Sequence, residues 1–205
     1  EAVSRFVERI KRQPAAGLIE RLRAQTAAVT IGDPTDRRHW MGPVNNAAAR
    51  SRYVDAVRQL REGGATLHAG GQLLQDGALA HGHYVSPVLA EAPADHPLWR
   101  QELFLPLLML QRVASRDEAM QRANDSDVGL TAGFYGGADE VAWFHDHIEA
   151  GVTYANRAQG ATTGAWPGYQ PFGGWKGSGS TGKAVASFYY LPLYLREQSR
   201  TVVVG

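Results

Sequence analysis

The stretch GSGSTGKA, residues 177–184, has the residue types of a phosphate-binding loop. Its first six letters fit G-x-G-x-x-G, and its first seven fit all but the last position of G-x-x-x-x-G-K-[ST]. The second pattern needs a hydroxyl after the lysine to bind magnesium, but Ala184 follows Lys183. No apolar strand precedes the string, and the aromatic, proline-containing segment after it does not predict a helix. We therefore reject both phosphate-binding interpretations.

A larger block, residues 164–184, places aromatic side chains among glycines: Trp166, Tyr169, Phe172 and Trp175. Glycine lets the backbone approach a ligand, or another backbone segment, without an intervening Cβ. Free backbone amides in such a loop bind carboxylates well. The block therefore predicts either an aromatic-walled pocket with an amide floor or a packed surface loop with structural aromatics, and the residue types alone leave both open.

Histidines and hydroxyls elsewhere do not form a site pattern. His145 and His147 are two apart on a predicted helix, so they point in different directions. His81 and His83 have no acidic or cysteine partner nearby in the sequence. We therefore expect no metal site. The hydroxyls of residues 178–181 do not belong to a recognisable Ser–His–Asp triad pattern, which disfavours a hydrolase.

The composition predicts an ordinary globular protein that stays in the cytoplasm. Of 205 residues, 44% are apolar and 20% charged, with a net charge of +1 and no basic block, so neither nucleic acid nor a membrane surface is an expected partner. No apolar run approaches the length of a membrane span, and the amphipathic start does not resemble a signal peptide. The chain has no cysteine, which excludes disulfides and a cysteine nucleophile within it.

The elements that must position any site follow an α/β pattern. Apolar periodicity and capping signals predict helices at residues 2–12, 16–27, 47–62, 115–123 and 138–150. Strands are predicted at residues 65–71, 83–92, 104–113, 129–136 and 151–157, with an extended tail at 188–204. From residue 104 onward strands and helices alternate, which indicates parallel pairing with right-handed crossovers.

Three details of these elements can be checked. In the helix at 47–62, Tyr53, Val54, Val57 and Leu60 are expected to share a buried face, and Gly63 is expected to end the helix. Pro87 predicts an edge or irregular position for the strand at 83–92. The apolar run at 104–113 predicts a buried strand.

Several motifs, in this order over residues 16–203, resemble those of the aldehyde dehydrogenases. They are QELFLP at 101–106 for E-x-F-G-P, ANDSDVGLTAGFYG at 123–136 for N-x-x-x-x-G-L-x-A, AGVTYANR at 150–157 for G-x-x-x-x-N, and residues 164–184 for G-A-x-x-G-x-Q-P-F-G-G-x-x-x-S-G. The last block, with REQSRTV at 196–202, looks most like the branch that oxidises L-glutamate γ-semialdehyde, the 1-pyrroline-5-carboxylate dehydrogenases of proline breakdown.

This resemblance implies a partial α/β fold: a three-layer, parallel-sheet catalytic domain over residues 1–185 and an extended oligomerisation tail over residues 186–205, through which the chain would form a homo-oligomer. It also implies a reaction. A cysteine thiolate attacks the aldehyde, hydride passes from the hemithioacetal to NAD, and a glutamate activates water to hydrolyse the thioester.

The resemblance assigns three residues to the cofactor. Glu102 matches the glutamate that binds the nicotinamide ribose hydroxyls, Phe104 the phenylalanine beside that ribose, and Leu130 a leucine near the nicotinamide. From the residues alone, Glu102 would be a solvated charge, and Phe104 and Leu130 would be core residues. Leu105 replaces the usual glycine of the motif, so the local backbone is expected to differ.

The resemblance assigns three more residues to the substrate, which would be a small aldehyde. Gly164 and Ala165 match the pair whose backbone amides bind the substrate's α-carboxylate, and Phe172 matches an aromatic wall of the aldehyde pocket. On this interpretation the glycine-rich block is a substrate anchor.

The reacting groups themselves are missing from the matched region. In the family, the nucleophilic cysteine, the general-base glutamate and the dinucleotide-binding domain all lie upstream of it, so this chain is expected to contain no catalytic residue of its own. An engineered or proteolytic fragment of a dehydrogenase, a truncated gene product, and a non-catalytic dehydrogenase-like domain that serves oligomerisation or covers another active site are the alternatives. We favour the fragment, because the substrate-anchor residues are retained.

Overall fold

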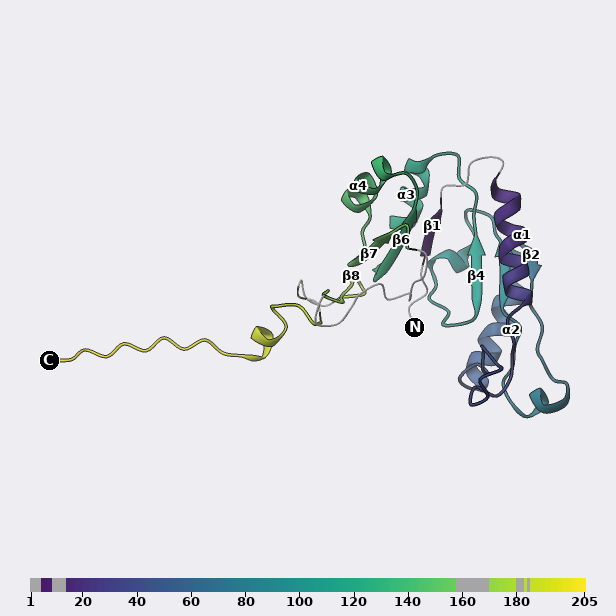
Figure 1. Ribbon diagram of the computed structural model, residues 1–205, viewed down its shortest axis with the longest axis horizontal. Coiled ribbons are helices and arrows are strands. Elements are labelled where there is room, and N and C mark those ends of the chain that lie inside the picture. The colour runs from purple at the N-terminus through teal and green to yellow at the C-terminus, as the bar shows by residue number, and fades with distance from the viewer. Residues whose placement is uncertain (1–4, 9–13, 158–169, 180–182, 184) are drawn as a thin grey trace. The chain divides into compact units, whose positions relative to one another are not determined.

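The computed structural model describes residues 5–8, 14–157, 170–179, 183 and 185–205 (Figure 1). It divides the chain into two compact units, Arg9–Arg116 and the combination of Glu1–Glu8 with Asp117–Gly205. Each unit has its own sheet and its own hydrophobic core.

The unit Arg9–Arg116 packs two helices on a three-stranded sheet. The helices are α1 (Pro14–Ala27) and α2 (Ala47–Glu62), and the strands are β2 (Thr66–Ala69), β3 (Val88–Glu91) and β4 (Leu107–Leu110). The sheet order is β2-β3-β4, with β2 antiparallel and β4 parallel to β3. Helix α1 packs against β2 and β3, and α2 packs against β2. The predicted helices at 16–27 and 47–62 are thus confirmed.

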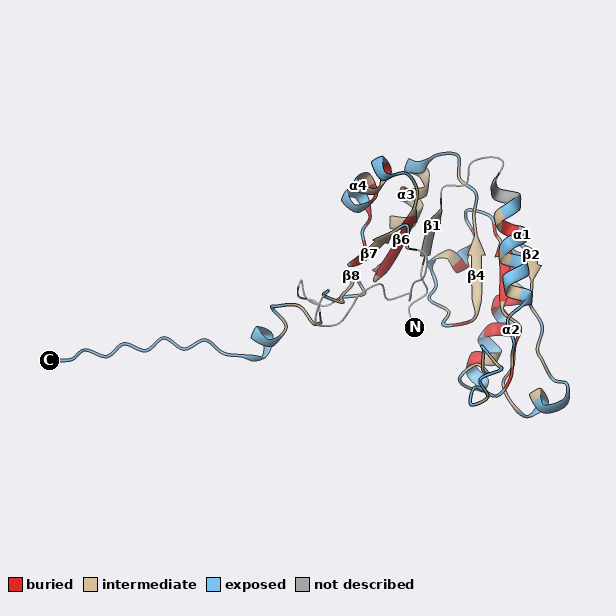
Figure 2. Cartoon of the chain, viewed as in Figure 1, coloured by how far each residue is buried: buried red, intermediate tan, exposed pale blue. Residues whose placement is uncertain are grey.

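Helix α2 shows why its bounds could be predicted. The Asn46 side chain accepts a hydrogen bond from the Ala49 amide at 2.8 Å, which satisfies one of the free amides of the first turn. At the other end the Gly63 amide donates to the Gln59 carbonyl at 2.8 Å. The buried face consists of Ala49, Tyr53, Ala56, Val57 and Leu60 (Figure 2). Val54 is 44% exposed, so its predicted place on that face is wrong, because a helix turns it away from Tyr53 and Val57.

Strand β3 corrects two sequence expectations about this sheet. It is the central strand, so of the two positions that Pro87 predicted, edge or irregular, the edge is wrong. Pro87 lies just before the first paired residue, so its missing N–H does not interrupt the ladder, and Val88 already donates to the Pro106 carbonyl at 2.8 Å. Strand β4, predicted to be buried, is half-buried and forms one edge of the sheet among the described residues.

The second unit carries a parallel sheet in the order β1-β6-β7. Its strands are β1 (Arg5–Glu8), β6 (Thr131–Tyr135) and β7 (Val152–Ala155), and its helices are α3 (Arg116–Asn124), which begins at the boundary between the units, and α4 (Ala138–His147). Strands β6 and β7 are parallel and are joined through α4, as the alternating pattern predicted. The stacked rings of Phe134 and Phe144, with centroids 5.0 Å apart, lie in the core between β6 and α4.

Two predictions about strand partners are wrong. Residues 5–8, expected within a helix at 2–12, form a strand parallel to β6, with Arg5 opposite Ala132. The edge of β6 offers unpaired amides and carbonyls, and pairing with them outweighs the weak helical periodicity of a short segment. Strand β4 was expected in the same parallel series as β6, but it pairs with β3. The order of elements along the chain does not state which sheet a strand joins.

The tail is extended and exposed from Leu195 onward, and before that residues 186–190 form turns that lead into one turn of 3₁₀ helix at Leu191–Tyr194. Its large apolar side chains other than the half-buried Tyr190 are at least 48% exposed: Phe188, Tyr189, Leu191, Leu193, Tyr194, Leu195, Val202, Val203 and Val204. The predicted boundary between residues 185 and 186 stays a prediction.

Candidate functional site

The loop at 101–106, which carries two predicted cofactor residues, is fixed at both ends. It joins a 3₁₀ helix (Pro97–Arg100) to β4. At its start the Gln101 amide donates to the Leu98 carbonyl at 3.3 Å. At its end the Leu105 side chain is buried in the core of the first unit, only 9% exposed, and the Pro106 carbonyl accepts from Val88. Two of the residues between these anchors are exposed to solvent.

Glu102 and Phe104 are those exposed residues, and both have chemistry to offer. The Glu102 carboxylate has no hydrogen-bond or ion-pair partner among the described residues. The Phe104 ring is 60% exposed, and its backbone has φ 57°, a left-handed conformation that costs about 1–2 kcal/mol for a residue with a Cβ. Strained backbone of this kind clusters at ligand sites. A free carboxylate can accept from both hydroxyls of a ribose, and an exposed ring can pack beside it, so these residues fit a dinucleotide.

Leu130, the third predicted cofactor residue, lies in the other unit at the end of a short strand. Strand β5 (Val128–Gly129) pairs antiparallel with β8 (Trp175–Lys176). The Leu130 carbonyl accepts from the Val152 amide at 2.9 Å, and its side chain is half-buried. Its backbone is therefore fixed on one side by β7 and on the other by the pairing of Gly129 with Trp175.

Of the predicted substrate residues, Phe172 is described, and Gly164 and Ala165 lie outside the described residues. Phe172 is half-buried, and its amide donates to the Val185 carbonyl at 2.8 Å. Its position next to Gly173 places it at the start of the segment that pairs with β5. Leu130 and Phe172 thus lie in one unit, whereas Glu102 and Phe104 belong to the other.

The described glycines of the block have a backbone-packing role. A Cβ on Gly151 would overlap the Gly173 carbonyl, and a Cβ on Gly179 would overlap the Gly174 carbonyl. A Cβ on Gly177 would come within 2.9 Å of the Asp127 carbonyl. Residues 173–179 therefore support the packed-loop interpretation of their part of the block, with backbone lying directly on backbone.

Two polar residues near these segments were missed as candidates. Asn156, directly after β7, has φ 52°, and its side chain accepts from the Gly136 amide and donates to the Gly136 carbonyl, both at 3.0 Å. Lys176 also has φ 52°, and its ammonium donates to the Asn124 carbonyl at 2.6 Å. An asparagine directly after a strand was a usable signal, because asparagine tolerates the left-handed conformation. No sequence signal pointed to Lys176.

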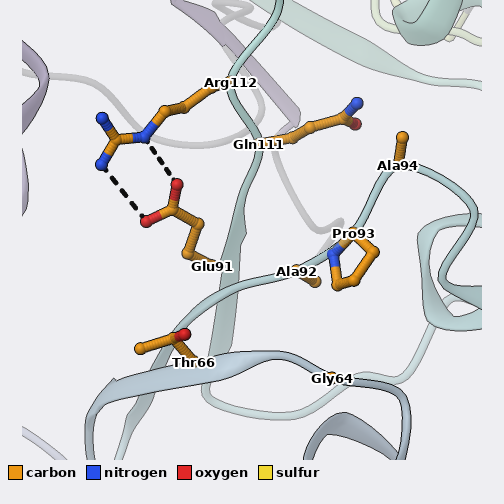
Figure 3. A pocket seen from close by; sticks show the side chains of 8 residues that line it. All are labelled: Gly64, Thr66, Glu91, Ala92, Pro93, Ala94, Gln111 and Arg112. Carbon is orange, nitrogen blue, oxygen red and sulfur yellow. Dashed lines mark hydrogen bonds and ion pairs between the residues drawn. The ribbon is translucent and has the colours of Figure 1, made fainter.

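A shallow groove of about 360 Å³ lies at the end of the first unit's sheet, and none of the residues that line it is a predicted site residue (Figure 3). Gln111 and Arg112 point to opposite sides of the strand there, and Arg112 pairs with Glu91 through Nε and Oε1 at 2.6 Å. The hydrogen bond from Arg112, and secondarily that from His68, lowers the pKa of the Glu91 carboxyl. Because Glu91 is already paired on both sides, it has little capacity left to bind a ligand.

The histidines on α4 bind different partners. His145 Nδ1 lies 3.0 Å from Thr153 Oγ1, and His147 Nδ1 lies 2.7 Å from the Trp143 carbonyl. Within the described ranges no three histidine, aspartate or glutamate side chains gather as a metal site would require. In the same part of the chain, no helix has the length and apolar character needed to cross a membrane.

Comparison with known proteins gives a consistent answer. Residues 2–199 match the model of the aldehyde dehydrogenase family. A betaine aldehyde dehydrogenase of Brucella ovis is 35% identical over 164 residues, 78% of this chain and 32% of the relative. One of Rhizobium etli is 33% identical over 174 residues, 83% and 34% respectively. The chain thus spans about a third of the length of these curated relatives.

Solved structures agree on the fold. A 1-pyrroline-5-carboxylate dehydrogenase from Thermus with bound NAD superposes with a TM-score of 0.81 at 28% identity, covering 94% of this chain and 35% of that one. A putative aldehyde dehydrogenase from Burkholderia cenocepacia gives 0.77 at 30% identity, covering 89% and 36%. The predicted partial α/β fold is confirmed.

Proposed function

This chain belongs to the aldehyde dehydrogenase family, and from that premise we propose that it is the carboxy-terminal portion of an NAD-dependent enzyme that oxidises an aldehyde to a carboxylic acid. The observation that carries the proposal is the loop at 101–106, which is anchored at both ends. It exposes an aromatic ring and, two residues earlier, a carboxylate that has no partner among the described residues. The chain contains no cysteine, so the nucleophile must be supplied by residues outside it.

The proposed contribution of this chain to cofactor binding is to hold the ribose next to the nicotinamide. Glu102 would accept hydrogen bonds from both ribose hydroxyls, Phe104 would pack beside the sugar, and Leu130 would contact the nicotinamide. NAD, when bound, supplies the acceptor for the hydride that leaves the substrate. The Thermus relative contains bound NAD, which supports NAD as the cofactor here.

The proposed substrate is L-glutamate γ-semialdehyde. The pattern of residues 164–184 and the Thermus 1-pyrroline-5-carboxylate dehydrogenase support it. The amides of Gly164 and Ala165 would bind the α-carboxylate, and Phe172 would line the aldehyde pocket. Betaine aldehyde is a second candidate, because the curated relatives are named for it. The two substrates differ in charge at the recognised end: one carries a carboxylate and the other only a quaternary ammonium group.

This charge difference gives a direct test. The complete protein is assayed with NAD and three aldehydes: glutamate γ-semialdehyde, 4-aminobutanal and betaine aldehyde. 4-Aminobutanal is the matched control, because it differs from glutamate γ-semialdehyde only by the α-carboxylate. We expect kcat/KM for 4-aminobutanal to be about a hundredfold lower than for glutamate γ-semialdehyde, because 4-aminobutanal has no carboxylate to accept charge-assisted hydrogen bonds from the amides. A preference for betaine aldehyde would establish the second candidate, and inactivity with every aldehyde would favour the non-catalytic domain.

We also propose that the tail, residues 186–205, mediates assembly into a homo-oligomer. Its apolar side chains are exposed in the single chain, and contiguous exposed apolar surface marks interaction sites. An extended segment can add a strand to a neighbouring sheet through main-chain hydrogen bonds. Analytical ultracentrifugation should show a smaller assembly when residues 186–205 are deleted, and an unchanged number of subunits would contradict this role.

A further inference from the structure

Lys176 connects the glycine-rich block to the ends of two helices. Its ammonium donates to the carbonyl of Asn124, the last residue of α3, at 2.6 Å, and it forms an ion pair with the Glu149 carboxylate, just beyond α4. The last carbonyls of a helix lack partners within the helix and carry partial negative charge, so a cation is favourable there. The Lys176 side chain is only 24% exposed, which leaves it little freedom to adopt other positions.

The acceptors of Lys176 are themselves held in place. The Asn124 side chain donates to the His147 carbonyl at 2.8 Å and accepts from the Glu149 amide at 2.9 Å. Asn124 therefore joins the end of α3 to the segment after α4. Lys176 approaches this junction from β8, so three separate parts of the chain meet at one ammonium group.

The backbone on either side of Lys176 is bound to β5. Gly177 donates to the Asp127 carbonyl at 2.8 Å, and the Ser178 hydroxyl accepts from the Gly129 amide at 3.1 Å. Leu130 follows this pairing on one strand, and Phe172 precedes it on the other by two residues, Gly173 and Gly174. The distance between Leu130 and Phe172, the two predicted ligand-contacting residues of this unit, thus depends on the position of β8 relative to β5.

We propose that Lys176 is a positioning residue for the reaction. It seats β8 against the ends of α3 and α4, and through the β5–β8 pairing it fixes the substrate-side Phe172 relative to the cofactor-side Leu130. This inference rests on the proposed function, which gives those two residues their roles. Because partly exposed ion pairs add little to stability, the effect of losing the ammonium should lie in the placement of the site rather than in folding.

The test uses the complete protein and three variants. Lys176→Met removes the charge but keeps a long unbranched side chain and a Cβ at the left-handed backbone position. Lys176→Arg restores a cation. Lys183→Met is the control for removing a charge, because Lys183 lies over the Tyr189 ring, 4.0 Å from its centroid, and the ammonium that binds Asn124 and Glu149 is that of Lys176. Steady-state kinetics with NAD and glutamate γ-semialdehyde is combined with hydrogen exchange of peptides covering residues 127–130 and 172–179.

We expect Lys176→Met to raise the KM for both the aldehyde and NAD by about tenfold while kcat changes less than about threefold, because misplaced contacts weaken binding of both ligands. Loss of folded protein alone would lower kcat and leave KM unchanged. Exchange of the two peptides should increase in Lys176→Met, and Lys176→Arg should restore both readouts. Lys183→Met should behave as the wild type.

Two outcomes would overturn the proposal. If the wild-type enzyme is active but Lys176→Met keeps both KM values, Lys176 does not position the site. If exchange is unchanged in Lys176→Met, the ammonium does not hold β8 at all, whatever the kinetics show. Hydrogen exchange does not depend on activity. An inactive wild type would contradict the proposed function, whereas unchanged exchange in Lys176→Met would contradict the role of Lys176 in holding β8.

Discussion

Asn156 offers the sharpest test of how the end of β7 is held. Its backbone is left-handed, with φ 52°, and its side chain makes two hydrogen bonds to the backbone of Gly136 at the end of β6. The adjacent ladder bond from the Asn156 amide to the Phe134 carbonyl, at 2.8 Å, keeps the two strand ends side by side. We predict that Asn156→Ala and Asn156→Gly destabilise the protein by different amounts, because only alanine carries a Cβ into the left-handed region.

The magnitudes follow from the contacts. Both variants lose two solvent-exposed hydrogen bonds, together about 1–2 kcal/mol. Alanine in addition meets the left-handed penalty of about 1 kcal/mol, which asparagine largely avoids through its short polar side chain. We therefore expect a loss in the free energy of unfolding of about 2–3 kcal/mol for Asn156→Ala and about 1–2 kcal/mol for Asn156→Gly.

Equilibrium unfolding in urea measures both values. Asn45→Ala is the control, because Asn45 is exposed and its side chain has no hydrogen-bond partner among the described residues. It should change the free energy of unfolding by less than about 0.5 kcal/mol. If alanine and glycine at position 156 prove equally stable, the left-handed conformation is refuted. If both match Asn45→Ala, the two hydrogen bonds to Gly136 contribute nothing.

Three further predictions concern the first unit. Glu102→Gln should raise the KM for NAD about tenfold at nearly unchanged kcat, because a neutral amide accepts more weakly from ribose hydroxyls; an unchanged KM would refute the ribose contact. Tyr53→Phe should lower the free energy of unfolding in urea by about 1–3 kcal/mol, because the Ser86 carbonyl loses a donor at 2.6 Å. Since Arg112 lowers the pKa of Glu91 from its ordinary 4.5, this pair stabilises the protein above that pH and its contribution is lost as the pH falls below it. Arg112 is 54% exposed, so Arg112→Met should change the free energy of unfolding little at pH 7, and it should flatten the fall of that free energy at acid pH.

Local signals predicted the elements whose boundaries depend on neighbouring residues. The end of α2 depends on Gly63, which the sequence analysis named, and its start depends on an Asn46 cap, a local signal that the structure adds. The strands on either side of α4 have a helix between them, which constrains them to be parallel. In these cases the physical cause of the structure lies within about 20 residues of its effect.

Non-local pairing is where the sequence was insufficient. Residues 5–8 have apolar spacing that suits a helix, but they pair with β6, more than 120 positions away. Strand β4 has the apolar run of a buried strand, yet among the described residues it forms an edge next to β3. Neither outcome can be obtained from periodicity, because the partner strand decides it. Lys176 was missed for a similar reason. Its acceptor is a backbone carbonyl 52 positions away, and every residue type has such a carbonyl, so the sequence does not indicate which one binds the lysine.

The departure at Leu105 can be understood from the same loop. The family motif has glycine at this position, which suggests a need for unusual backbone there. In this chain, among the described non-glycine residues, positive φ occurs at Phe104, Asn156, Lys176 and Ala186, and not at Leu105. In this loop the left-handed backbone lies at Phe104, and Leu105 buries its side chain in the core. Burying a leucine contributes about 2 kcal/mol, enough to offset the about 1–2 kcal/mol that the left-handed Phe104 costs. The replacement of glycine is therefore compatible with a loop in which Glu102 and Phe104 remain exposed.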